Sequence, residues 1–344
     1  MTFQVLNWLY VQEERASLLL DHDAVRVRAP DREPVTLPLL AIEGIVCFGT
    51  PHVSTALIQR CASEGRELVF LTWSGRFAGR MEGPCSGNVL LRRAQHVAGL
   101  SEDRALAIAR PIVAAKVQSS RLVLQRAARE IADPHGSGQL STAAAALAEM
   151  LPRVREARSL DELRGHEGEA AATYFGVFPH MIRQRAFAER FDGRQRRPPR
   201  DPVNAVLSFL YTLLRMEIVA ALESAGLDPQ VGYLHTLRPG RPALALDLLE
   251  ELRAPLADRL TLTLLNRRQL TLDHFQEEPG GAVYLNDRGR EVVLAAHRRR
   301  KQEEVEHPLL KQRIPWALVP HAQARVLARH LRGDVDRYVP FLAR

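Results

Sequence analysis

Apolar and polar residues alternate with two different periods, and the change falls near residue 90. Before it, apolar stretches of strand length are separated by charged residues, glycine or proline, as in LNWLYVQ, AVRVRA and ELVFLT. The stretch between Pro51 and Glu64 predicts a single helix, which Gly65 ends. Strands at this regular spacing predict a small β-sandwich or a pair of packed sheets.

From about residue 90 onward, apolar residues recur every three or four positions, the period of amphipathic helices. Residues 201–222 are apolar nearly all round, which predicts a central buried helix that Asp201 caps. The segment GGAVYLN at 280–286 has the pattern of a hairpin strand. The predicted fold class is therefore α+β, with an N-terminal β-sandwich domain at 1–90 and a larger all-helical domain at 91–344.

Composition narrows the classes of function. The formal net charge of +7 and the isoelectric point near 9.7 favour a polyanionic partner. The three cysteines show no CxxC spacing, which indicates a reduced intracellular protein without a zinc finger. The N-terminus lacks a signal-peptide pattern, and the most apolar run, Ala205–Leu214, is shorter than the ~20 residues of a membrane span. We therefore expect a cytoplasmic protein that contacts no membrane.

Glu167 is the first candidate for site chemistry. The capping-box pair Ser159 and Glu162 predicts a helix that begins near Leu160, and its period places Glu167 on the apolar face and Glu169 away from it. The other residues on that face are Leu163, Ala170, Ala171, Tyr174 and Phe178. A carboxylate there must be paired, hydrogen-bonded or metal-bound, because burying a bare charge is costly. From this segment alone, a salt bridge to an interior arginine explains Glu167 slightly better than a metal.

Asp247 and Glu250 lie one turn apart on a helix that Pro242 opens and that runs to about Leu260. Small alanines flank both acids and form a shallow acidic notch, in which an ion or a phosphate fits. The alternative is a solvated helix face with acids near its N-terminus, where the helix dipole favours them. For two such acids in isolation, that alternative is the better explanation.

His235 stands shortly before this helix, and the turn-rich TLRPGRP between them can fold it back over both acids. Hard oxygen ligands joined by one imidazole suit Mg²⁺ or Mn²⁺, the usual ions of phosphodiester chemistry. Arg238 and Arg241 then lie beside the ion, where they can hold phosphate oxygens. A lone histidine is more often a satisfied polar residue, so only the conjunction of these segments supports a metal site.

Two basic runs are further candidates for contact with DNA phosphates. GRQRRPPR (193–200) contains Arg196 and Arg197, and HRRRK spans 297–301. A solvated linker explains the first run equally well, and an exposed helix face explains the second at least as well.

Five longer stretches resemble one known family, the CRISPR-associated integrases, which are the first-numbered Cas proteins and acquire spacers. These stretches are EGPCSGNVLLRRAQ, GHEGEAAATYFGVF, RRPPRDPVNAVLSFLYTLL, GLDPQVGYLHTLRPGRPALALDLLEELRAPLADRL and LLNRRQL. The sequences of these stretches are most similar to those of the type I-C subgroup. The resemblance spans most of the chain and is far more specific than a single metal motif.

The resemblance implies that Glu167, His235 and Glu250 are the catalytic metal ligands, with Asp247 as an additional acid and Mg²⁺ or Mn²⁺ as the cofactor. Glu250 stands where some relatives carry aspartate. The family's β-sandwich followed by a helical catalytic domain agrees with the change of period.

The resemblance also implies a reaction and its partners. The 3′-hydroxyl of a protospacer DNA fragment attacks a phosphodiester at the edge of a CRISPR repeat. A basic residue near the GRP turn falls on Arg241, with Arg238 as its competitor. Two active sites complete one insertion, so a homodimer is implied, with the N-terminal domain as its dimerisation part. Two dimers flank a dimer of a small ferredoxin-like Cas partner.

Two other functions stay open. One is a stand-alone metal-dependent nuclease that acts on branched DNA. The other is a non-catalytic DNA-binding scaffold, in which the ligand-like residues are only structural. Joining of DNA strands distinguishes an integrase from the nuclease, whereas a scaffold binds DNA without metal and without strand chemistry.

Overall fold

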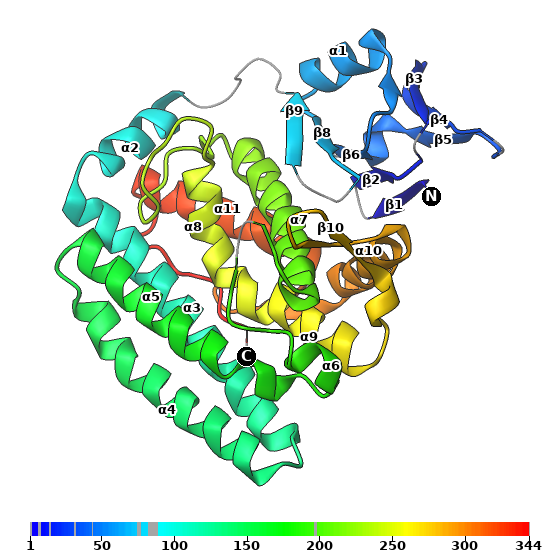
Figure 1. Ribbon diagram of the computed structural model, residues 1–344. Coiled ribbons are helices and arrows are strands. Elements are labelled where there is room, and N and C mark those ends of the chain that lie inside the picture. Colours follow the sequence, from blue (N-terminus) through cyan, green and yellow to red (C-terminus); the bar gives the residue numbers. More distant parts are fainter. Residues whose placement is uncertain are drawn as a thin grey trace. The chain divides into compact units, whose positions relative to one another are not determined.

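The chain divides into two compact units, Met1–Ser86 and Gly87–Arg344 (Figure 1). The computed structural model describes residues 2–5, 8–13, 15–30, 32–42, 44–73, 77–81, 89–195 and 198–343. The change of period near residue 90 lies close to this division.

The first unit is built from two β-sheets. Its strands are β1 Thr2–Val5, β2 Trp8–Val11, β3 Ser17–Asp21, β4 Ala24–Arg28, β5 Val35–Pro38, β6 Gly44–Phe48, β7 His52–Val53, β8 Glu67–Leu71 and β9 Phe77–Met81. A five-stranded sheet has the order β1–β2–β6–β8–β9, and a four-stranded sheet has the order β5–β4–β3–β7. Leu18 of β3, Ile45 of β6 and Leu68 of β8 are fully buried in one core, so the two sheets pack together as predicted.

The helix expected in this unit is α1, Thr55–Ser63. Ser54 caps it by accepting a hydrogen bond from the N–H of Leu57. Gly65 follows with a φ of +67°, a left-handed conformation that glycine adopts without strain.

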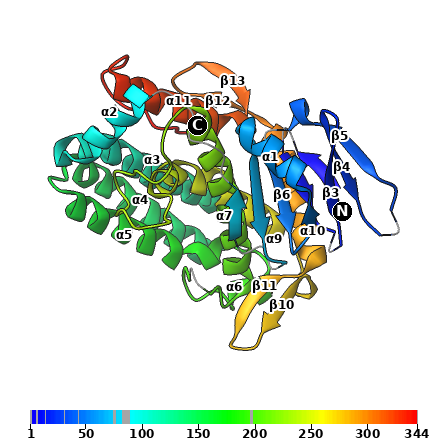
Figure 2. The ribbon, with the colours of Figure 1, turned by 90° about the horizontal axis from the view of Figure 1, so that it is seen from above.

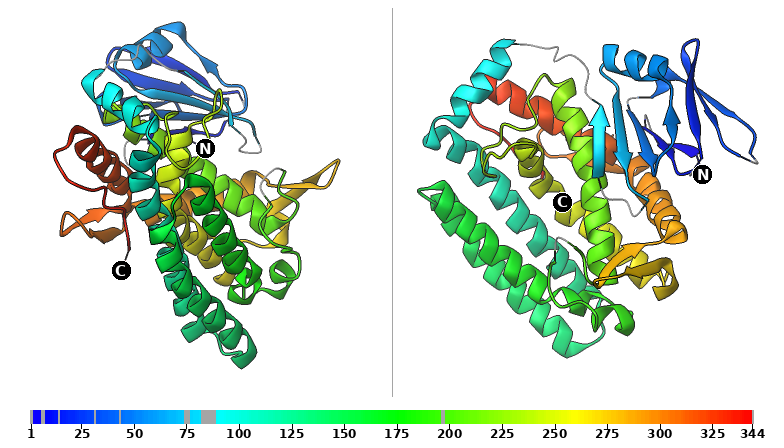
Figure 3. Two further views of the ribbon diagram at one scale, coloured as in Figure 1. Left: turned by 90° about the vertical axis from the view of Figure 1, so that its left-hand side faces the viewer. Right: turned by 45° about the horizontal axis from the view of Figure 1, so that its top comes forward.

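The second unit is mainly helical. Its helices are α2 Val89–Gly99, α3 Glu102–Glu130, α4 Pro134–Glu156, α5 Leu160–Gly176, α6 Arg185–Ala188, α7 Pro202–Ser224, α8 Ala243–Leu252, α9 Arg259–Asn266, α10 Asp287–Gln302 and α11 Val319–Arg332. The long helices α3, α4 and α5 lie side by side (Figure 3). Because α8 packs against both α3 and α7, its acidic side chains are enclosed rather than solvated.

Helix α7 is the central buried helix that the sequence predicts. Asp201 caps it by accepting a hydrogen bond from the N–H of Asn204 at 2.8 Å, and Pro202 is its first residue. The helix spans 23 residues, so the apolar run at Ala205–Leu214 understates it: by length and composition it is long enough to cross a membrane. However, 78% of its most apolar window is buried inside the structure, as expected of a core helix.

Two β-hairpins extend from the helical unit (Figure 2). The strand expected at 280–286 is β11, Ala282–Leu285, which pairs with β10, Phe275–Glu278. The second hairpin, β12 Glu304–His307 with β13 Gln312–Pro315, was not predicted. Its strands have four residues each and are mostly polar, so they are too short to show an alternating period.

Helix α8 also holds the C-terminal segment through Glu251, which is fully buried. The Tyr338 hydroxyl donates to Glu251 Oε1 at 2.5 Å, and Gln323 Nε2 and the N–H of Phe341 donate to Oε2 at 2.8 and 2.7 Å. Burial raises the pKa of Glu251 to about 8, although these three donors counteract it. The residue next to Glu250 is therefore tied to the end of the chain.

Helix α10 contains the basic run at 297–301, but the structure buries part of it. His297 Nε2 lies 3.8 Å and Lys301 Nζ 2.8 Å from Glu217 Oε1, and all three side chains are buried. These two residues are therefore not an exposed phosphate contact, whereas Arg298 and Arg299 are exposed. Burial lowers the pKa of His297 from 6.5 to about 4, although Glu217 opposes the shift.

We predict that His297 makes the protein sensitive to mild acid. The fold favours the neutral ring, whereas the unfolded chain protonates it below about pH 6.5. The free energy of unfolding is therefore unaffected by this group above pH 6.5 and falls as the pH is lowered toward 4. The loss is about 3 kcal/mol, at about 1.4 kcal/mol per pKa unit. Urea unfolding between pH 7 and 4 is expected to show a smaller loss of stability for His297→Gln than for the wild type. Equal losses over that interval would contradict the prediction.

Candidate active site

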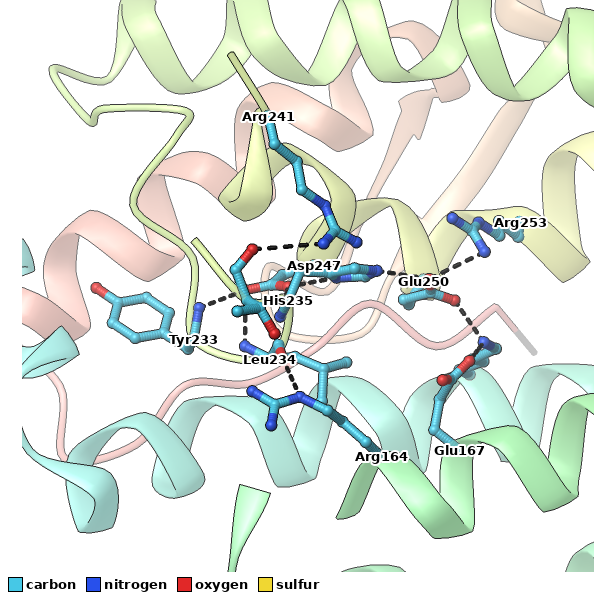
Figure 4. Close-up of polar contacts among 11 residues, drawn as sticks. Arg164, Glu167, Tyr233, Leu234, His235, Arg241, Asp247, Glu250 and Arg253 are labelled. Atoms are coloured by element: carbon cyan, nitrogen blue, oxygen red, sulfur yellow. Dashed lines mark hydrogen bonds and ion pairs between the residues drawn. The ribbon is translucent and has the colours of Figure 1, made fainter. Parts of the chain in front are cut away.

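The buried carboxylate of Asp247 organises the loop that precedes α8 (Figure 4). Its Oδ2 accepts the N–H groups of Tyr233 at 2.6 Å and Leu234 at 3.0 Å. Its Oδ1 accepts the N–H of His235 at 2.9 Å and lies 2.7 Å from Nδ1 of the same ring. Because an ionised carboxylate only accepts, His235 Nδ1 carries the proton and Nε2 keeps its lone pair.

This loop approaches α8 closely at Gly232. A Cβ atom at Gly232 would lie 2.8 Å from Asp247 Oδ2 and 2.7 Å from the carbonyl carbon of Ala243. Any larger residue must push the carboxylate or the start of α8 aside. The absence of a side chain at Gly232 therefore permits three consecutive N–H groups to reach Asp247.

Glu250 lies next to the Nε2 atom of His235. Its Oε1 lies 3.8 Å from His235 Nε2 and 3.0 Å from Arg253 Nη1, and its Oε2 lies 2.7 Å from Lys116 Nζ. The residue is 1% exposed. Burial alone raises its pKa, but the charges of Arg253 and Lys116 outweigh burial and hold the pKa at about 2. Glu250 is therefore an ionised carboxylate inside the protein.

Glu167 reaches the same cluster from α5. Ser159 caps this helix by accepting the N–H of Glu162, which confirms the predicted start. Glu167 Oε1 forms a short hydrogen-bonded ion pair with Lys116 Nζ, whereas Glu169 points outward to Arg153. The partner of Glu167 is thus a lysine, not the arginine that the sequence alternative specified.

Helix α8 begins at Ala243, directly after Pro242, and does not end near Leu260. It continues through a π-helical segment, Arg253–Asp258, into α9. Pro255 lies in this segment and has no N–H, which interrupts the regular hydrogen-bond ladder. The acidic notch expected to be shallow is instead buried.

Two cations of the site were missed from the sequence. Lys116 is one of only three lysines and lies on α3 between the buried residues Ala115 and Val117, and a rare lysine in an apolar stretch is a signal that the sequence contains. Arg253 follows Glu250 by three residues, and its guanidinium lies 4.9 Å from the centre of the Tyr211 ring. The contacts of Lys116 with the glutamates and of Arg253 with Tyr211 join helices that are distant in sequence, whereas the Arg253–Glu250 pair is local.

The predicted DNA-contacting arginines take different positions. Arg238 is exposed at the turn, and Arg241 Nη1 donates to the carbonyl of Thr236 at 3.4 Å (Figure 4). Arg196 and Arg197 lie outside the described residues.

The donor set suits a hard divalent ion. Two carboxylates and one imidazole nitrogen are typical ligands of Mg²⁺ or Mn²⁺. Within the described part of the chain, no group of three or more His, Cys, Asp or Glu residues is close enough to hold an ion. The ammonium of Lys116 contacts both Glu167 and Glu250, so a cation already marks the position that the two carboxylates share.

The fold and this site define a class: a two-unit α+β protein whose helical unit gathers carboxylates, a histidine and basic side chains. Residues 9–299 match the family model described as CRISPR associated protein Cas1. A CRISPR-associated endonuclease Cas1 of Moorella thermoacetica is 48% identical over 340 residues, which cover 99% of each chain. A second one, of Rhodospirillum rubrum, is 46% identical over 98% of each chain. The chain therefore belongs to the Cas1 family.

Solved structures with the same fold have lower sequence identity. A CAS1 protein from Thermotoga maritima has a TM-score of 0.82 at 23% identity and covers 95% of this chain and 97% of its own. A casposase bound to an integration product has a TM-score of 0.81 at 21% identity, with 96% and 92% covered. A Cas6-RT-Cas1–Cas2 complex has a TM-score of 0.83 at 22% identity and covers 99% of this chain and 36% of its own.

We predict that Gly232→Ala destabilises the protein by about 1–3 kcal/mol, because the new methyl group overpacks the Asp247 carboxylate. Gly165→Ala is the matched control: this glycine lies inside α5, and no atom lies within 4 Å of its built Cβ. The control is expected to be neutral or to stabilise by up to about 1 kcal/mol. Urea unfolding measures both changes, and an equal response of the two variants would contradict the close approach.

Proposed function

We propose that this protein is a metal-dependent DNA endonuclease and integrase of CRISPR adaptation, which inserts protospacer DNA into the CRISPR array. The observation that supports it most is the meeting of His235 and Glu250 with Glu167, through Lys116, in a chain of the Cas1 family. Its curated relatives are endonucleases by name, and the casposase that shares the fold is bound to an integration product.

In this proposal Glu167, Glu250 and Nε2 of His235 hold the ion. When bound, Mg²⁺ or Mn²⁺ polarises the scissile phosphate and stabilises charge on the attacking and leaving oxygens. His235 is suited to this role because its Nδ1–H donates to Asp247, which leaves Nε2 neutral and directed at Glu250. Asp247 is a positioning residue rather than a fourth ligand, since its oxygens already accept from three backbone groups and the ring.

The reaction is a transesterification. The 3′-hydroxyl of the incoming strand forms a new P–O bond at the edge of the repeat, and the repeat's own 3′-oxygen leaves and takes up a proton. In this proposal Arg238 and Arg241 contact phosphates next to the site, which the exposure of Arg238 supports, and Arg196 and Arg197 are further DNA contacts. Water in place of the hydroxyl gives hydrolysis, which is the endonuclease activity.

The proposal includes partners and location. The DNA substrates are protospacer fragments and the CRISPR repeat, and the net charge of +7 suits both. We infer a homodimer formed through the first unit, a small ferredoxin-like Cas partner, and a cytoplasmic location without membrane contact. The Cas1–Cas2 complex with the same fold supports the Cas partner. The type I-C subgroup stays a prediction from the sequence.

We predict that Glu167→Gln, His235→Ala and Glu250→Gln each lower strand transfer by about a hundredfold or more, since each removes an ion ligand. The assay joins labelled DNA to a supercoiled plasmid that carries the CRISPR array. Glu169→Gln is the matched control on the same helix, because this side chain points outward to Arg153, and it is expected to retain full activity.

The same assay separates the alternatives. Metal-dependent cleavage without joining favours the stand-alone nuclease. Metal-independent DNA binding with no strand chemistry favours the scaffold. Full activity in all three ligand variants would remove the proposed site.

We predict a different pattern for Asp247→Asn. The amide keeps the shape of the side chain but lacks the charge that holds the His235 ring and its backbone. Strand transfer is expected to fall about ten- to a hundredfold while Mn²⁺ still binds, because the three proposed ligands remain. Complete loss of Mn²⁺ binding with retained folding would instead make Asp247 a ligand.

A further inference from the structure

Lys116 links three helices at the centre of the site. Its ammonium, carried by α3, forms ion pairs with Glu167 of α5 and with Glu250 of α8, the latter at 2.7 Å. The side chain is only 11% exposed. Two carboxylates from different helices thus share one enclosed cation, as they would share a divalent ion.

The charges explain why a cation is held there. Among the contacts described above, Glu167, Glu250 and Asp247 are balanced by Lys116 and Arg253 alone, which leaves one excess negative charge. Without the ammonium, the two glutamates would face each other in a poorly solvated space, which is unfavourable.

The ammonium of Lys116 can move away from Glu250 more easily than the guanidinium of Arg253 can. Arg253 is held between Glu250 and the face of the Tyr211 ring, a planar stack that fixes the guanidinium. Lysine carries a compact ammonium on a flexible four-carbon stem and makes no such stack.

A pocket beside the site can receive the Lys116 ammonium when it moves away from the glutamates. This small pocket, with a cavity volume of about 30 Å³, opens to solvent and is lined by Lys116, Ser120, Tyr211 and Asp258, and also by Arg194 and Arg253. Ser120 and Asp258 supply oxygen acceptors for an ammonium, and Asp258 already accepts from the Tyr211 hydroxyl at 2.5 Å. Ser120 and Asp258 therefore offer an ammonium that turns away from the glutamates two acceptors, in a pocket whose remaining lining is mainly apolar.

We propose that Lys116 is the resident cation of the Glu167–Glu250 pair, and that a divalent ion binds by replacing its ammonium, which turns into the adjacent pocket. This inference rests on the proposed function, because it takes both glutamates as ion ligands. Lys116 then keeps the carboxylates together in the metal-free protein and, by competing for them, weakens metal binding.

The test is Mn²⁺ binding to the full chain without DNA, measured by calorimetry and by the electron paramagnetic resonance signal of free Mn²⁺. Lys116→Met removes the ammonium at similar length, and we expect Mn²⁺ to bind at least about tenfold tighter, a difference of about 1.4 kcal/mol. Arg253→Met removes one positive charge from the other side of Glu250, and a much smaller gain is expected. An equal gain would show that net charge alone matters and would overturn the exchange.

Thermal unfolding provides a second measurement. Metal-free Lys116→Met is expected to melt below the wild type, because its glutamates repel each other, and Mn²⁺ is expected to raise its Tm more than that of the wild type. Lys116→Gln is expected to show the same order if Lys116→Met does not fold. Equal or weaker Mn²⁺ binding in the lysine variants overturns the exchange.

Glu250→Gln separates failure of this inference from failure of the proposed function. If Mn²⁺ binds the wild type and Glu250→Gln abolishes binding, the ligand assignment stands whatever the lysine variants do. If Mn²⁺ binds none of these proteins, both proposals are overturned.

Discussion

The buried carboxylate of Asp247 is the constraint on which the site depends. A charge with no solvent contact must be fully hydrogen-bonded, and Asp247 meets that need with three successive backbone N–H groups and the His235 ring. Those bonds fold the preceding loop back onto α8 and set the tautomer of the ring. The orientation of His235 toward Glu250 follows from them, and Gly232 makes the approach possible.

Burial of charge also accounts for the rest of the cluster. Helix α8 is enclosed by α3 and α7, so Glu250 stays ionised because the charges of Arg253 and Lys116 lie next to it. The π-helical segment at Arg253–Asp258 places Arg253 against Glu250 on one side and Tyr211 on the other. The same buried glutamates thus form structural ion pairs and attract a cation. Lys116 supplies that cation when no metal is bound, because its ammonium pairs with both glutamates.

Local periodicity predicted much of the fold. The helix around Glu167, its cap at Ser159 and the burial of α7 follow from spacing that is visible within one turn or two of the chain. The continuation of α8 through the π-helical segment into α9, which ends at Asn266, and the second hairpin were missed, because a proline-containing helix and four-residue strands give weak local signals. Sequence spacing also placed Asp247 and Glu250 one turn apart, but for two such acids in isolation it favoured a solvated helix face, whereas both are buried. Burial depends on the packing of other helices, which spacing does not show.

By itself, the sequence determined that Glu167 lies on an apolar helix face, that two acids lie one turn apart, and which family the chain resembles. Only the tertiary structure decided that Asp247 accepts hydrogen bonds from the loop backbone while Glu250 pairs with Lys116 and Arg253. It also decided that Lys116 pairs with two glutamates, one of them 51 residues away. The physical reason is that the helical period is local, whereas the pairing of buried charges is set by which helices meet. A long-range ion pair leaves no spacing in the sequence from which it can be predicted.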